Sequence, residues 1–75
     1  MDVAIIIDGV VQNVIVVRDV AHAQSLFPGT QCFERKPNIM LEPGAAIVGK
    51  AVIRAADVDD TVKLQAKSAL VVLDK

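Results

Sequence analysis

The stretch that decides the fold is residues 3–17, which read VAIIIDGVVQNVIVV. Two runs rich in valine and isoleucine, residues 3–7 and 10–17, flank the dipeptide Asp8-Gly9. Such β-branched side chains suit a pleated strand, and Asp-Gly accepts the positive φ angles that a type I′ turn needs at both central positions. The stretch therefore predicts a β-hairpin whose two-residue turn is Asp8-Gly9.

A two-residue turn also predicts which residues of the two strands face each other. Counting outward from the turn gives three pairs: Ile7 with Val10, Ile5 with Gln12, and Val3 with Val14. Both faces of this hairpin are mainly apolar, whereas a sheet with one face in water alternates apolar and polar residues. We therefore expect other parts of the chain, or a partner, to cover the hairpin on both sides.

A short helix is expected directly after the hairpin. Asp19 suits the N-cap position, and Pro28-Gly29 ends the pattern. The apolar residues between them recur at helical spacing: Val20, Ala23, Leu26 and Phe27. The pattern predicts a helix over residues 20–27 that can cover one face of the hairpin.

The middle of the chain carries strand and turn signals. Residues 30–34 predict a short strand, and Glu42-Pro43-Gly44 predicts a type II turn, because proline suits its first central position and glycine its second. Residues 45–54 are apolar except for Gly49, Lys50 and the terminal arginine. We expect one strand there, bent or bulged at Gly49.

The C-terminal segment, residues 58–73, leaves two structures open. A helical stripe joins residues spaced three or four apart: Val58, Val62, Gln65, Ala66, Ala69 and Leu73. Residues 62–67 also alternate apolar and polar as a strand would. The prediction for residues 1–75 is thus one small α+β domain: an N-terminal antiparallel hairpin, one short helix, further strands, and a C-terminal helix or strand.

Composition bounds the possible functions. The net charge is −1 and the isoelectric point about 5.6, which disfavours a nucleic-acid binder, since these show basic patches and a high isoelectric point. The densest basic cluster, Arg35-Lys36, is expected in a solvated loop. Hydrophobic residues make up 53% of the chain but include only two aromatic side chains. So many aliphatic side chains in so short a chain favour self-association or binding to a permanent partner.

The start of the chain argues against secretion and against a membrane anchor. Asp2 stands where a signal peptide carries positive charge, and the first apolar run breaks at Asp8, too early for a signal core or a membrane span. Cys32 is the only cysteine, so no internal disulfide can form. We expect synthesis and folding in a cytosol.

No motif for chemistry emerges. His22 lacks companion ligands for a metal and is expected to be solvated on the short helix, and Cys32 is expected to be a buried or interfacial thiol. Asp57, Asp59 and Asp60 lack the glycine and terminal glutamate of a calcium loop and favour an acidic helix start or a turn. Residues 43–50 end in Gly-Lys like a phosphate loop, but Ala follows where a hydroxyl must bind magnesium.

These readings predict no catalytic, cofactor-binding or metal-binding residue, no cofactor and no small-molecule substrate. We therefore expect that the chain is not an enzyme.

Two segments resemble small structural proteins of tailed phages. Residues 4–16, followed by an alanine-containing helix that ends in Leu-Phe-Pro-Gly at residues 26–29, resemble the β-hairpin modules of tail and tail-fibre-associated proteins over residues 3–34. Those modules continue with a glycine-rich segment that holds Trp and Tyr, and this chain has neither. Residues 55–61 and 69–73 are similar to the end of capsid-decoration proteins. The resemblance assigns no site residue.

The resemblance implies a non-enzymatic virion structural protein, of tail or capsid, that acts by self-association and docking. Its partners would be copies of itself or other virion proteins, with no nucleic acid and no membrane. It would reside in the host cytoplasm during assembly and then in the virion. The alternative from another class is a small cytosolic inhibitor or adaptor that binds one host protein.

Overall fold

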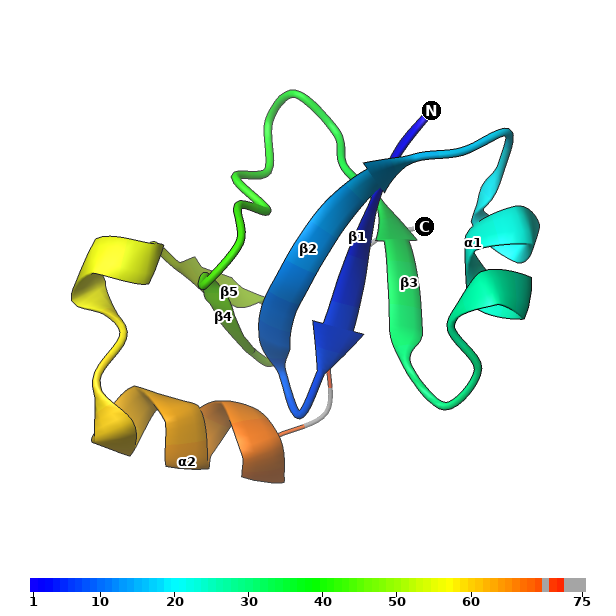
Figure 1. Cartoon of the computed structure of the whole chain (residues 1–75). Coiled ribbons are helices and arrows are strands. Elements are labelled where there is room, and N and C mark those ends of the chain that lie inside the picture. Colours follow the sequence, from blue (N-terminus) through cyan, green and yellow to red (C-terminus); the bar gives the residue numbers. More distant parts are fainter. Residues whose placement is uncertain (70, 73–75) are drawn as a thin grey trace.

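The computed structural model describes residues 1–69, 71 and 72, and it places the chain in the α+β class, as predicted (Figure 1). The elements follow one another as β1 (Asp2–Ile7), β2 (Val10–Val16), α1 (Val20–Leu26), β3 (Gln31–Glu34), β4 (Ala46–Val48), β5 (Ala51–Ile53), the 3₁₀ helix η1 (Ala55–Asp57) and α2 (Asp60–Ser68). The five strands form one antiparallel sheet in the order β3-β1-β2-β4-β5.

The predicted N-terminal hairpin is confirmed. Asp8 and Gly9 have φ angles of 52° and 78°, and positive φ at both positions is the mark of a type I′ turn. Ile7 faces Val10 across this turn, as expected.

Beyond the turn, the predicted register is wrong by one residue, because a β-bulge interrupts the pairing between Ile5 and Ile6. Ile5 faces Asn13 instead of Gln12, and Val3 faces Ile15 instead of Val14. Without the extra residue, Gln12 and Asn13 would each point into one apolar face. In the structure both side chains are exposed, and the shifted register moves Val14 to the face of Ala4 and Ile15 to the face of Val3.

Two apolar clusters cover the two faces of the hairpin. On one face α1 contributes Ala23, and the buried cluster is Val3, Ile5, Ala23 and Cys32. On the other face the chain after β3 folds over the sheet, and the buried cluster is Ala4, Ile6, Val11, Phe33, Leu41, Ala45 and Ile47. The shifted register places Val14 beside the second cluster and Ile15 beside the first.

The helix and turn predictions before residue 46 are confirmed. Asp19 is the N-cap of α1, and its Oδ1 accepts a hydrogen bond from the His22 backbone N–H at 2.7 Å. β3 lies within the predicted residues 30–34. The backbone N–H of Ala45 donates to the Glu42 carbonyl at 3.0 Å, and Gly44 has a φ of 90°, as a type II turn requires.

The single bent strand predicted over residues 45–54 is wrong. The chain reverses at Gly49-Lys50, so that β4 and β5 form a second hairpin. Gly49 has a φ of 62°, whereas Lys50 is not among the residues with a positive φ. This is the pattern of a type II′ turn with glycine at the first central position.

The C-terminal segment is helical over residues 60–68, so the strand alternative is wrong there, whereas the described residues 69, 71 and 72 lie beyond the helix. Asp59 is the N-cap of α2, and its Oδ1 accepts from the Val62 N–H at 2.8 Å. The η1 turn that precedes it was not expected. Residue 73 of the predicted helical stripe lies outside the described residues.

The hairpin turn packs directly against α2 (Figure 1). A Cβ built on Gly9 would meet the Ala66 carbonyl carbon at 2.7 Å and the Ala66 Cβ at 2.8 Å, and would overlap the carbonyl oxygen. Gly9 and Ala66 are both buried. Glycine is therefore required here twice, for its positive φ and for the close approach of the helix.

Candidate docking surface

Three of the side chains that the sequence singled out for chemistry have structural roles. Cys32 is 8% exposed, as predicted for a buried thiol, and its Sγ lies 3.6 Å from the Thr30 hydroxyl. Asp59 caps α2 and Asp60 lies in its first turn, which confirms the acidic helix start. Within the described part of the chain, no group of three His, Cys, Asp or Glu side chains is arranged to hold a metal ion.

The prediction for His22 is wrong in part. The side chain was expected in water, but the residue is half-buried, and its Nδ1 is buried with no hydrogen-bond partner among the described residues. The Gly49-Lys50 dipeptide turns into the strand β5 and not into a helix, so it lacks the geometry of a phosphate loop.

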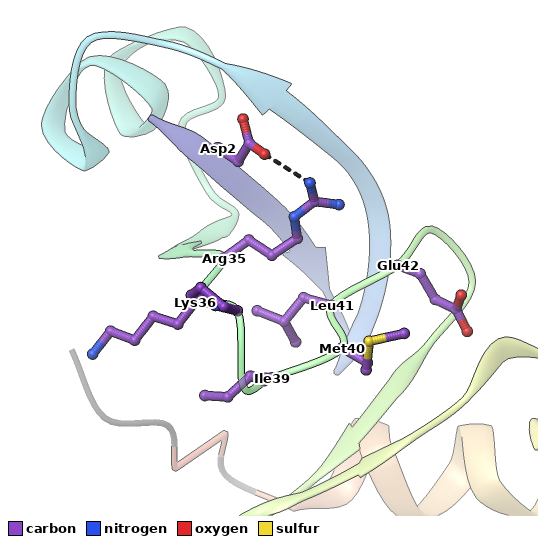
Figure 2. A pocket seen from close by; sticks show the side chains of 8 residues that line it. Asp2, Arg35, Lys36, Ile39, Met40, Leu41 and Glu42 are labelled. Atoms are coloured by element: carbon purple, nitrogen blue, oxygen red, sulfur yellow. Dashed lines mark hydrogen bonds and ion pairs between the residues drawn. The ribbon is translucent and has the colours of Figure 1, made fainter.

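A cleft lies between the ends of β1 and β3 and the loop that follows β3 (Figure 2). Its volume is about 300 Å³. Arg35 Nη2 lies 2.7 Å from Asp2 Oδ2 across one wall, and Glu42 Oε1 accepts from the Ala55 N–H at 3.1 Å. Both carboxylates thus bind other parts of the chain. Arg35 and Lys36 lie in a loop, as expected, but the Arg35 side chain is paired with Asp2 and not free in solvent.

A larger groove, which we call the tip groove, lies between the hairpin turn and α2. It has a volume of about 670 Å³, and its lining residues are Ile7, Asp8, Val10, Gln12, Asp60, Lys63, Leu64 and Lys67. Ile7 is 44% exposed and Leu64 is 67% exposed. Large aliphatic side chains from two elements far apart in sequence are therefore open to solvent on one surface.

Helical spacing explains why α2 gives these side chains to the groove. Asp60, Lys63, Leu64 and Lys67 stand at positions i, i+3, i+4 and i+7, which form one face of a helix. Ala66, on another side of α2, is buried against Gly9. Docking of the helix through its smallest apolar residue leaves the large Leu64 facing outward.

The sequence reading missed this surface. The helical stripe contained Val62, which is half-buried, and Ala66, which is buried, but it gave Leu64 no role outside the strand alternative. No local signal marks this surface, because it depends on the contact between Gly9 and Ala66, which lie far apart in the sequence.

Comparisons of this chain with models of protein families, with curated proteins and with solved structures find no match. No helix among the described residues is long and apolar enough to cross a lipid bilayer.

Proposed function

We propose that this chain is a non-enzymatic structural protein of a tailed-phage particle, and that it assembles by docking through the tip groove onto a second copy of itself. The observation that carries the docking proposal is the exposure of Ile7 and Leu64 on one surface, at 44% and 67%. Exposed apolar surface that gathers in one place, with polar residues at its rim, is typical of protein interaction sites.

The charges around the tip groove favour a second copy as the occupant. Asp8 and Asp60 supply two negative charges, and Lys63 and Lys67 supply two positive charges. In a two-fold dimer the same patch meets itself, so each residue needs a complement within that patch. A rim with equal numbers of acids and lysines around an aliphatic centre meets this condition.

The tailed-phage context rests on the resemblance of residues 3–34 to tail and tail-fibre-associated hairpin modules. Phage particles are built from repeated copies of small subunits, a role that requires binding surface and no reaction. Mass spectrometry of purified particles should find the chain in stoichiometric amounts. Its absence from the particles, together with a stable complex with one host protein, would replace this proposal with the inhibitor or adaptor.

The dimer is tested with two variants of opposite charge. Lys63→Glu/Lys67→Glu makes the rim acidic, and Asp8→Asn/Asp60→Lys makes it basic, with asparagine chosen because it tolerates positive φ. Each variant alone should lose self-association in sedimentation velocity, because like charges then face each other. Mixed in equal amounts, the two variants should form a heterodimer.

The control matched to the acidic variant is Lys50→Glu/Arg54→Glu, which changes the net charge by the same amount as Lys63→Glu/Lys67→Glu, at exposed residues outside the groove. This control should associate like the wild type. Self-association that survives in each groove variant alone would place the interface elsewhere and refute the tip groove as the contact.

A further inference from the structure

The outer edge of β3 presents unpaired backbone groups. The Arg35 N–H donates to the Asp2 carbonyl at 2.8 Å across β1 and β3, and backbone groups in a strand alternate in direction. The backbone N–H and C=O groups of Phe33 therefore also point toward β1, whereas those of Cys32 and Glu34 point away from it. Among the described residues, no backbone hydrogen bond reaches these groups of Cys32 and Glu34.

A groove runs between this edge and α1, which lies beside β3 (Figure 1). Its volume is about 430 Å³, and it is lined by Val20, Ala21 and Gln24 of α1 and by Cys32, Phe33 and Glu34 of β3. We call it the edge groove. It lies beside β3, whereas the tip groove lies between the hairpin turn and α2.

The two polar side chains of the edge groove differ in whether other groups of the chain already bind them. The Gln24 amide donates to the carbonyls of Thr30 at 2.8 Å and Phe27 at 3.2 Å, which fixes its position. Glu34 is exposed, and its carboxylate takes part in no ion pair within the described residues. The groove thus combines an apolar wall with one unpaired negative charge.

The other open edges of the sheet are less suited to pairing. At the outer side of β2, the Val14 N–H is already taken by the Asn13 side chain at 2.9 Å, and such local bonds reduce the free hydrogen-bonding capacity of an edge. β5 has only three residues. β3 has four residues and a groove alongside.

We propose that β3 binds an extended peptide segment of a partner protein as a sixth, antiparallel strand of the sheet, with the motif basic–x–aliphatic read from its N-terminus. Strand addition to an open edge takes affinity from backbone hydrogen bonds and specificity from alternate side chains. The antiparallel direction matches every strand pair already in the sheet.

The motif follows from the two residues of β3 whose backbone groups point away from the sheet. Cys32 and Glu34 are two apart, so their side chains lie on the same face of the sheet, the face that carries α1. The peptide residue opposite Glu34 should be basic, and the residue opposite Cys32 should be aliphatic and enter the groove beside Val20 and Ala21. Because the peptide runs antiparallel to β3, its residue opposite Glu34 precedes its residue opposite Cys32 in the peptide sequence.

A second copy of this chain fits the edge groove poorly. β3 reads Gln-Cys-Phe-Glu and offers no basic residue to place opposite Glu34. The edge groove therefore calls for a different protein, which goes beyond the self-association proposed for the tip groove.

The test uses the full-length ¹⁵N-labelled chain and a blocked peptide, Thr-Lys-Thr-Val-Thr, in an NMR titration. Shift changes should be confined to β3 and α1, and hydrogen exchange of the Cys32 and Glu34 amides should slow on binding. N-methylation of the lysine or the valine of the peptide should weaken binding more than about tenfold, because each of these N–H groups bonds to β3. N-methylation of the central threonine, whose N–H points to solvent, should leave the affinity unchanged.

Two further controls test the charge and the direction. Glu34→Lys should weaken the lysine peptide about fivefold or more and bind Thr-Glu-Thr-Val-Thr instead. The reversed peptide, Thr-Val-Thr-Lys-Thr, should bind less tightly than the original. The Lys63→Glu/Lys67→Glu variant should bind the peptide like the wild type, which separates this result from the fate of the tip groove.

Three results would overturn the proposal. The first is no shift change at millimolar peptide, and the second is binding that N-methylation at the lysine and valine does not affect. The third is protection of the Cys32 and Glu34 amides in the free protein that grows with protein concentration, since a second copy would then occupy the edge.

Discussion

Replacing Gly9 with alanine should destabilise the protein more than the same change at any open turn. Gly9 has a φ of 78° and lies under α2. The new Cβ would lie 2.7 Å from the Ala66 carbonyl carbon and 2.8 Å from its Cβ, and these belong to the helix backbone and to a side chain with no freedom to turn away. Either the hairpin turn or α2 must move.

The magnitude has two parts. A left-handed backbone costs an alanine about 1–2 kcal/mol, and overpacking in a tight contact costs about 1–3 kcal/mol. The free energy of unfolding should therefore fall by about 2–5 kcal/mol, and at about 4–8 °C for each kcal/mol the Tm should fall by about 8 °C or more.

Gly29→Ala is the matched control. Gly29 has a φ of 83°, but a Cβ there would meet no atom within 4 Å. This variant should lose only the backbone part, about 1–2 kcal/mol. Thermal and urea unfolding followed by circular dichroism would measure both. If Gly9→Ala is no less stable than Gly29→Ala, α2 does not press on the hairpin turn, and the tip groove is not formed as described.

Three other changes test the core and the helix caps by the same unfolding assay. Leu41→Ala should cost about 2–5 kcal/mol, since Leu41 is 1% exposed in the larger cluster; a loss below 1 kcal/mol would contradict that packing. Asp59→Ala should cost about 1 kcal/mol through the lost N-cap of α2, whereas exposed Asp57, which caps nothing, should tolerate alanine within about 0.5 kcal/mol. Ile15→Asp should cost several kcal/mol, because it places a carboxylate against the cluster that contains Ala23 of α1. A Tm like that of the wild type would show that this face is open to solvent.

Signals contained within a few residues predicted the structure well. Asp8-Gly9 fixed the turn, and Asp19 and Pro28-Gly29 bounded α1, because each acts on the backbone next to it. The bulge after Val11 could not be derived in this way. It depends on whether Gln12 and Asn13 would be buried, and so on elements far away in the sequence that cover each face.

The second hairpin and the tip groove show the same limit. Gly49-Lys50 lacks the Asn-Gly or Asp-Gly signature, and a glycine in an apolar run is compatible with both a bend and a reversal. The tip groove depends on α2 reaching Gly9 across more than fifty residues of chain. The outward position of Leu64 follows from that contact, and no local pattern contains it.

The expectation that both faces of the hairpin are covered is met by this chain itself. α1 covers one face, and the chain around Leu41 and Ile47 covers the other. The exposed aliphatic surface is narrower and lies at the turn end, at Ile7 and Leu64. Self-association should therefore be weaker and more local than a fully open sheet face would produce.

The mass of the wild-type chain in solution tests the central proposal most directly. Sedimentation equilibrium over a range from micromolar to millimolar concentration should show the mass rise from 8.0 kDa toward twice that value. In the Leu64→Glu variant the mass should stay at the monomer value, because the carboxylate would enter the centre of the contact. A wild-type chain that remains a monomer at millimolar concentration would contradict assembly through the tip groove.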